Sequence, residues 1–132
     1  MKENLNQRII EFQMFEMQLN ELAQQKEIVE KQMTELRNLE LSLDQVGEMK
    51  PQTEMFSIVG QDTFVRSELK DTKKVLVNVG SKIFVNKGLE EVKKSIENRL
   101  HKIEFIQQEL NKKAEKILEK LRKIGEEIKA CS

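Results

Sequence analysis

Apolar residues recur every seven positions in two long stretches of the chain, one toward each end. Residues 89–132 keep this repeat almost without a break, and residues 3–46 carry a matching one. Heptad spacing holds one apolar stripe against a partner helix, so both stretches are predicted to be coiled-coil helices. The first stripe contains Phe12, Phe15, Leu19, Leu22, Val29, Met33, Leu36 and Leu43, and the second contains Leu89, Ile96, Leu100, Ile103, Leu110, Ala114, Ile117, Leu121, Ile124, Ile128 and Cys131.

Between these stretches the pattern changes to short runs rich in Val, Ile, Phe and Thr. Such runs predict four strands, at residues 55–59, 63–69, 75–79 and 83–86. Gly60 lies between the first two runs and Gly80 between the last two, so each pair is predicted to form a hairpin whose turn includes the glycine. Val75, Val77 and Val79 are expected to alternate toward one face of the second hairpin.

The chain therefore divides into a helix over 1–47, a double hairpin over 53–87 and a helix over 88–132. Gly47 and Pro51 are expected to stop the first helix, because glycine relaxes the backbone and proline removes a hydrogen-bond donor. If the second helix folds back along the first, a single register places stripe residues of the two helices opposite one another along their length. It joins Phe12 with Ile124, Phe15 with Leu121, Leu19 with Ile117, Leu22 with Ala114, Met33 with Ile103, and Leu36 with Leu100. The predicted fold class is α+β, with a long antiparallel two-helix coiled coil joined by two β-hairpins.

Composition supports long solvated helices and gives little sign of other partners. Charged residues make up 35% of the chain and hydrophobic residues only 38%, whereas globular domains average about 25% and about 45–50%. Basic and acidic residues balance at 23 each, and Trp and Tyr are absent, so no nucleic-acid partner is expected. No apolar run approaches the roughly 18 residues of a membrane span, and the single cysteine fits a reducing compartment. A cytosolic protein without membrane association is expected.

No constellation typical of catalysis is visible. Gly60 and Gly80 stand alone, without the further glycines and lysine of a phosphate-binding loop. His101 is the only histidine and has no cysteine near it with which to build a zinc site. We expect no enzyme, no cofactor and no metal. A basic run formed by Lys112, Lys113, Lys116, Lys120, Arg122 and Lys123 contains the interleaved Glu115 and Glu119, which favours a solvated helix face over a binding patch.

The hairpins are expected to drive assembly. Two short hairpins cannot bury both of their faces alone, and their open edges can pair with strands of other chains. The strand residues assigned to this assembly surface are Phe56, Ile58, Phe64, Val65, Leu69, Val75, Val77, Val79, Ile83 and Val85.

The free ends of the two helices carry more apolar residues than one stripe requires. Flexible methionines suit a surface that accepts many shapes, so these ends are predicted to bind apolar surfaces transiently. The alternative is that the residues belong to the stripe or are ordinary surface scatter. The candidate binding residues are Ile9, Ile10, Phe12, Met14, Phe15, Met17, Leu118, Leu121, Ile124 and Ile128.

The segment FSIVGQDTFVRSELKDTKKVLVNVGSKIFVNKGLEE, residues 56–91, resembles the double-hairpin region of α-type prefoldin subunits, which are archaeal and eukaryotic co-chaperones. The resemblance covers almost the whole chain. It implies a hetero-hexamer of two α-type and four β-type subunits, joined through the hairpins into a double β-barrel platform with coiled-coil arms. The ends of the arms would hold non-native polypeptides and pass them to a group II chaperonin without nucleotide hydrolysis. An archaeal origin is expected.

Two other functions remain open at this point. The hairpins could polymerise the chain into a structural filament or scaffold in which the helix ends have no role. A less favoured alternative is an amphipathic N-terminal helix that docks on membranes.

Overall fold

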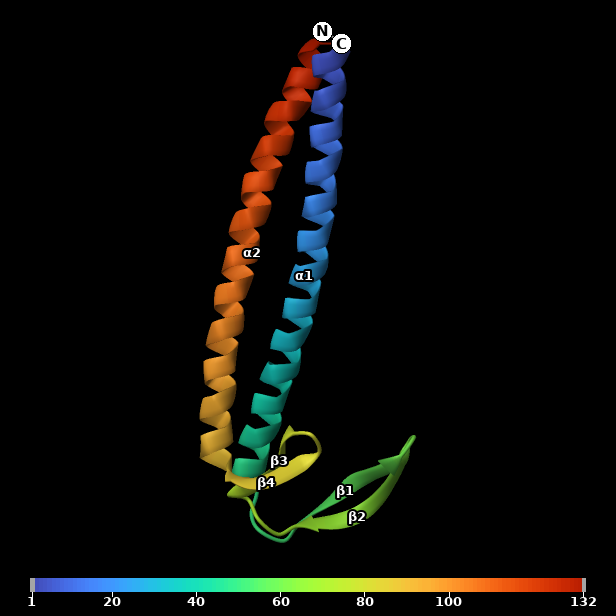
Figure 1. Ribbon diagram of the computed structural model, residues 1–132. Helices are drawn as coiled ribbons and strands as arrows, with labels where there is room; N and C mark the ends of the chain where they lie inside the picture. Colours follow the sequence, from blue (N-terminus) through green and yellow to red (C-terminus); the bar gives the residue numbers. More distant parts are fainter. Residues whose placement is uncertain (1, 132) are drawn as a thin grey trace. The chain divides into compact units, whose positions relative to one another are not determined.

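The computed structural model describes residues 2–131, which form two helices and two hairpins (Figure 1). The elements in order are α1 (Lys2–Glu48), β1 (Thr53–Gly60), β2 (Thr63–Leu69), β3 (Lys74–Gly80), β4 (Ile83–Gly88) and α2 (Leu89–Cys131). The predicted combination of two helices with two small antiparallel hairpins is confirmed. Contacts divide the chain into a first unit, residues 2–34 with 101–131, and a second unit, Glu35–Leu100, and each is described by itself.

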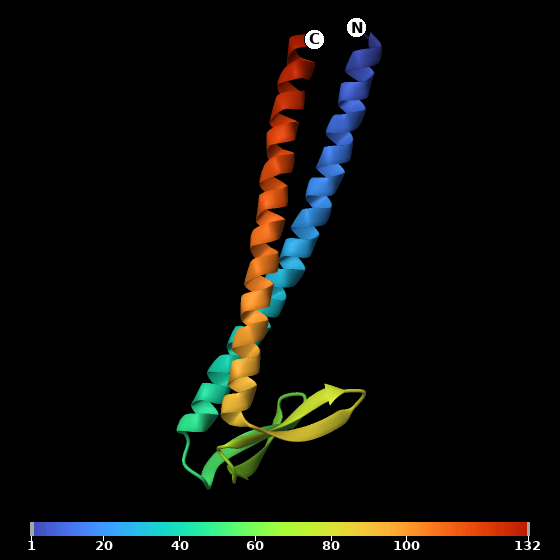
Figure 2. The ribbon, with the colours of Figure 1, turned by 60° about the vertical axis from the view of Figure 1, so that its left-hand side comes forward.

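The first unit is an antiparallel pair of helical segments, which lie side by side in both views (Figures 1 and 2). Its core consists of Leu22, Val29 and Met33 from α1 with Leu110 and Ala114 from α2. These residues belong to the heptad stripes, so the stripes are the surfaces that pack together. Burying one such large apolar side chain contributes about 1.5–3 kcal/mol, which is the main stabilising interaction available to a helix pair without a sheet.

Contacts near the helix ends of this unit keep the same alignment. The Nε atom of Arg8 lies 2.8 Å from Oε2 of Glu127. The Nζ atom of Lys120 lies 5.2 Å from the centre of the Phe15 ring. Phe15 was expected opposite Leu121, so the observed contact lies within one residue of the predicted pairing.

The second unit contains the end of α1, both hairpins and the start of α2. β1 pairs with β2 and β3 pairs with β4, each as a separate antiparallel two-stranded sheet (Figure 2). Ile58 lies opposite Phe64 in the first hairpin, and Val77 lies opposite Val85 in the second. The register then shifts by one residue before the turn in both hairpins.

The turns were predicted to include the glycines, but the structure places both glycines in strands. Gly60 and Gly80 end strands β1 and β3, and the loops consist of residues 61–62 and 81–82. Ser81 and Lys82 both have positive φ, at 50° and 62°, as the two central residues of a type I′ turn require. Of the two glycines, only Gly80 requires the conformational freedom of glycine, because its φ of 127° is strained for other residues.

The register shift also changes the expected face of Val79. The pairing passes from Asn78 with Phe84 directly to Gly80 with Ile83. Val79 is therefore the extra residue of a bulge and does not continue the alternation of Val75 and Val77. The prediction that the three valines alternate toward one face is wrong for Val79.

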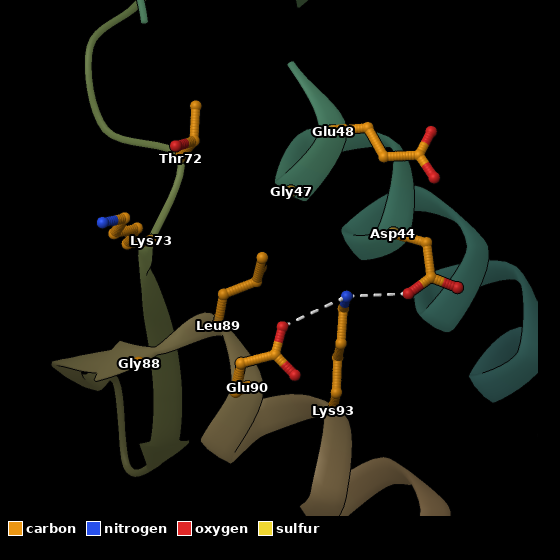
Figure 3. Close-up of a pocket in the computed structure, with 9 residues that line it drawn as sticks. All are labelled: Asp44, Gly47, Glu48, Thr72, Lys73, Gly88, Leu89, Glu90 and Lys93. Carbon is orange, nitrogen blue, oxygen red and sulfur yellow. Dashed lines mark ion pairs between the residues drawn. The ribbon is translucent and has the colours of Figure 1, made fainter. Parts of the chain in front are cut away.

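Gly47 has a packing role and not the predicted role of stopping α1. The helix continues through Gly47 to Glu48 and ends before Pro51, which disfavours helical geometry in the residue that precedes it. A Cβ atom at position 47 would lie only 2.9 Å from Cδ2 of Leu89, whose side chain points toward this part of α1 (Figure 3). Leu89 is 4% exposed. The absence of a side chain at position 47 thus lets the start of α2 pack closely on α1.

We therefore predict that Gly47→Ala and Gly125→Ala have different effects on stability. Both glycines lie within helices, where alanine is favoured by up to about 1 kcal/mol. A Cβ atom at Gly125 would meet its nearest neighbour, Cε2 of Phe12, at an ordinary 3.7 Å, whereas at Gly47 it would crowd Leu89. Gly125→Ala should raise the free energy of unfolding, measured by denaturant titration and far-UV circular dichroism. Gly47→Ala should give no gain or a loss, and an equal gain at both sites would contradict the proposed role of Gly47.

Candidate functional site

One face of the first hairpin carries an exposed apolar cluster beside charged side chains. Residues directly opposite one another in an antiparallel pair share a face, which places Ile58 and Phe64 together and Phe56 beside Arg66. Ile58 is 73% exposed, and Phe56 and Phe64 are also exposed. Such a cluster on a two-stranded sheet is a surface suited to burial against another element.

The other face of the same hairpin carries no charged side chain and is partly covered. The hydroxyl oxygens of Ser57 and Ser67 lie 2.6 Å apart in a hydrogen bond. Met55 and Leu69 are half-buried on this face. The two faces of the β1–β2 sheet are therefore chemically distinct.

The second hairpin has apolar residues on both faces. Val77 and Val85 lie opposite one another on one face, and Leu76 and Phe84 lie on the other. Leu76 and Phe84 are both exposed, although neither was assigned to the assembly surface from the sequence. Each lies directly between two assigned residues of a continuous apolar run, and that run was the signal that could have found them.

The structure places most of the predicted assembly residues on the surface. Both sheets have only two strands, so each strand has an unpaired edge within the described part of the chain. Phe56, Ile58, Phe64, Val65, Val79, Ile83 and Val85 are exposed, whereas Leu69, Val75 and Val77 are half-buried.

A second apolar surface lies near the start of α1, within the first unit. Ile10, Met14 and Met17 are spaced by four and three residues, which puts them on the same side of the helix. They are 57%, 55% and 65% exposed. We call these three residues the N-terminal apolar face.

The remaining residues predicted at the helix ends divide between surface and core. Ile9 and Leu118 are exposed, and Phe12, Phe15, Leu121 and Ile128 are half-buried. Ile124 is only 7% exposed. It belongs to the contact between the helices, so its assignment to an exposed binding surface needs correction.

Several exposed apolar residues were not singled out from the sequence. Ile28 and Phe105 in the first unit and Leu41 in the second are each about as exposed as Met17. They stand outside the heptad stripes, and although Ile106 and Leu39 near them are also exposed, no group of three such residues on one side of a helix was recognised around them.

A cavity of about 560 Å³ in the second unit contains several charged groups (Figure 3). Lys93 Nζ lies 2.8 Å from Oδ1 of Asp44 and 3.5 Å from Oε1 of Glu90. The hydrogen bond to Asp44 is the main cause that raises the pKa of Lys93. The ammonium group is thus engaged by two carboxylates of the protein, and its role here is to tie α2 to α1.

Within residues 2–131, no group of three or more His, Cys, Asp or Glu side chains is placed to hold a metal ion. Neither α1 nor α2, over the same residues, contains a stretch that is long and apolar enough to cross a membrane. The exposed surfaces described above are therefore the candidate sites.

Two solved structures share this fold. Filamentous PFD from Methanocaldococcus jannaschii is 19% identical, with a TM-score of 0.74 over 86% of this chain and 93% of that chain. The prefoldin beta subunit from Thermococcus strain KS-1 is 16% identical, with a TM-score of 0.65 over 97% of this chain and 91% of that chain. No curated protein sequence matches the chain significantly.

The sequence also matches a family model. The model describes a prefoldin subunit, and the match extends over residues 15–132. This range includes both hairpins, all of α2 and most of α1. The chain therefore belongs to the prefoldin subunit family.

Proposed function

We propose that the chain is an α-type prefoldin subunit that holds non-native polypeptides in the cytosol and passes them to a group II chaperonin without nucleotide hydrolysis. The observation that carries the proposal is the N-terminal apolar face, where Ile10, Met14 and Met17 are exposed on one side of α1 in a member of the prefoldin family. Unfolded polypeptides expose apolar side chains that native proteins bury, and an apolar surface can bind them without a specific sequence.

The chemistry of the N-terminal apolar face suits transient binding. Methionine side chains are flexible and polarizable, so Met14 and Met17 can adapt to clients of different shape. A surface of three side chains binds weakly by itself. Several subunits that engage one client together gain avidity, because each later contact is made within the same complex.

The hairpins support the proposed assembly and subunit type. Two hairpins with exposed apolar residues and open strand edges suit pairing with strands of other subunits. The presence of two hairpins, instead of one, is the basis for assigning the α type. We propose that two such chains and four β-type subunits assemble through the hairpins into a β-barrel platform, with the helices as coiled-coil arms.

Replacing the N-terminal apolar face should weaken holding. The triple variant Ile10→Ser, Met14→Ser and Met17→Ser removes apolar contact area while leaving the buried stripe intact. If each substitution lowers the binding free energy by about 0.5 kcal/mol, the three together lower the affinity for the client about tenfold. We expect about tenfold more complex to be needed to suppress the aggregation of a chemically denatured test protein, measured by light scattering.

The matched control replaces three equally exposed apolar residues elsewhere. The variant Ile28→Ser, Leu41→Ser and Phe105→Ser changes side chains that are 59%, 61% and 63% exposed. It should suppress aggregation as well as the unmodified complex does. Equal loss in both variants, or no loss in the first, would contradict binding at the N-terminal apolar face.

Assembly should depend on the exposed face of the first hairpin. The double variant Ile58→Ser and Phe64→Ser removes a cross-strand apolar pair that makes no core contact within the chain. We expect the variant to keep its helix content by circular dichroism and to form fewer hexamers with a β-type subunit, measured by native mass spectrometry. Long filaments of the chain alone, or hexamers formed equally well by the variant, would contradict the proposed assembly.

A further inference from the structure

The structure separates five of the six residues of the basic run of α2 into two sets of side chains. In the first set, Lys112 Nζ lies 3.7 Å from Glu109, and Arg122 lies 2.6 Å from Glu119 and 2.7 Å from Glu126. These ion pairs follow the helix surface and match the predicted solvated face. The second set, Lys113, Lys116 and Lys120, lines a groove along the helix pair of the first unit.

This groove combines an apolar floor with a basic wall. Its volume is about 320 Å³, and Leu22 of α1 and Ile117 of α2 contribute its aliphatic residues. The side of the groove formed by α1 carries Gln18, Gln25 and one carboxylate, Glu21. Three lysines thus face mainly neutral amide side chains, so the groove has an excess of positive charge.

The lysines of the groove make no close contact with a carboxylate of the described chain. Within residues 2–131, no ion pair with a carboxylate engages Lys113, Lys116 or Lys120. Lys120 instead lies over the ring of Phe15, with its Nζ atom 5.2 Å from the ring centre. This cation–π contact holds one ammonium group in place without cancelling its charge.

Another groove in the same unit has the opposite character. It is lined by Glu27 and Glu30 with a single lysine, Lys26, and by the apolar residues Leu19, Ala23, Ala114 and Leu118. The positive charge is therefore a property of the groove that Lys113, Lys116 and Lys120 line, and not of the helix pair as a whole. A ligand guided by charge would distinguish the two grooves.

We propose that the groove lined by Lys113, Lys116 and Lys120 docks a short acidic segment of polypeptide, in which carboxylates alternate with apolar side chains. The carboxylates would pair with the lysines, and the apolar side chains would contact Leu22 and Ile117. Between Gln18 and Gln25 the groove extends about 10 Å along α1, which matches about three residues of extended chain. An aliphatic floor suits a peptide better than a nucleic acid, whose bases stack on aromatic rings.

The proposal can be tested with a fluorescent peptide of alternating Leu and Glu and the assembled protein. The variant Lys113→Gln with Lys116→Gln removes two charges from the groove and leaves the contact between Lys120 and Phe15 in place. We expect it to raise the peptide Kd about fivefold, measured by fluorescence anisotropy at low salt. The matched variant Lys112→Gln with Lys123→Gln makes the same charge change outside the groove and should alter the Kd less than about twofold.

Three further results decide between this docking site and its alternatives. A peptide of alternating Leu and Gln should bind much more weakly, and equal binding would overturn the role of charge. An oligothymidylate that displaces the peptide and loses binding in the same variant would make the groove a general polyanion site and overturn the proposal. The serine variant of the N-terminal apolar face should keep its affinity for the Leu–Glu peptide, so failure of the proposed holding function would not be confused with failure here.

Discussion

The contact between the apolar stripes of α1 and α2 is the interaction on which the first unit depends. Leu22, Val29, Met33, Leu110 and Ala114 form its core, and no sheet or third helix covers them within the described residues of this unit. A helix pair of this kind has only one apolar line to bury, so its stability depends on keeping the stripes aligned. Helix positions outside the stripes are therefore not constrained by this contact and can carry apolar or charged side chains.

That freedom separates stability from surface chemistry along the helices. Ile10, Met14 and Met17 lie on one outward side of α1. Their exposure does not destabilise the core, because none of them belongs to it. The charges are divided in a similar way. Arg122 is engaged by two carboxylates of its own helix, whereas Lys113 and Lys116 remain available beside a groove. One helix pair can therefore present an apolar surface and a basic groove at different places.

The second unit relies on close packing at one point and leaves its hairpins open. Leu89 is buried where Gly47 provides space, and Lys93 bridges Asp44 and Glu90 beside it. The hairpins, in contrast, expose Ile58, Phe64, Leu76 and Phe84. The start of α2 is thus held against the end of α1, whereas the apolar side chains of the strands remain uncovered within the described chain.

Much of the architecture could be predicted from the sequence, because periodicity is a local property. Heptad spacing identified the residues that form the core of the first unit, and the short β-rich runs identified four strands in two hairpins. The exposure of Ile10, Met14 and Met17 also followed from the pattern, since they lie outside the stripe. The tertiary structure was needed where two distant segments meet or where backbone geometry intervenes. It showed that Gly47 makes room for Leu89 and that Val79 is a bulge residue. It also separated the basic run into paired and groove-lining residues, because which lysine finds a carboxylate depends on side-chain positions in space, which composition and spacing do not specify.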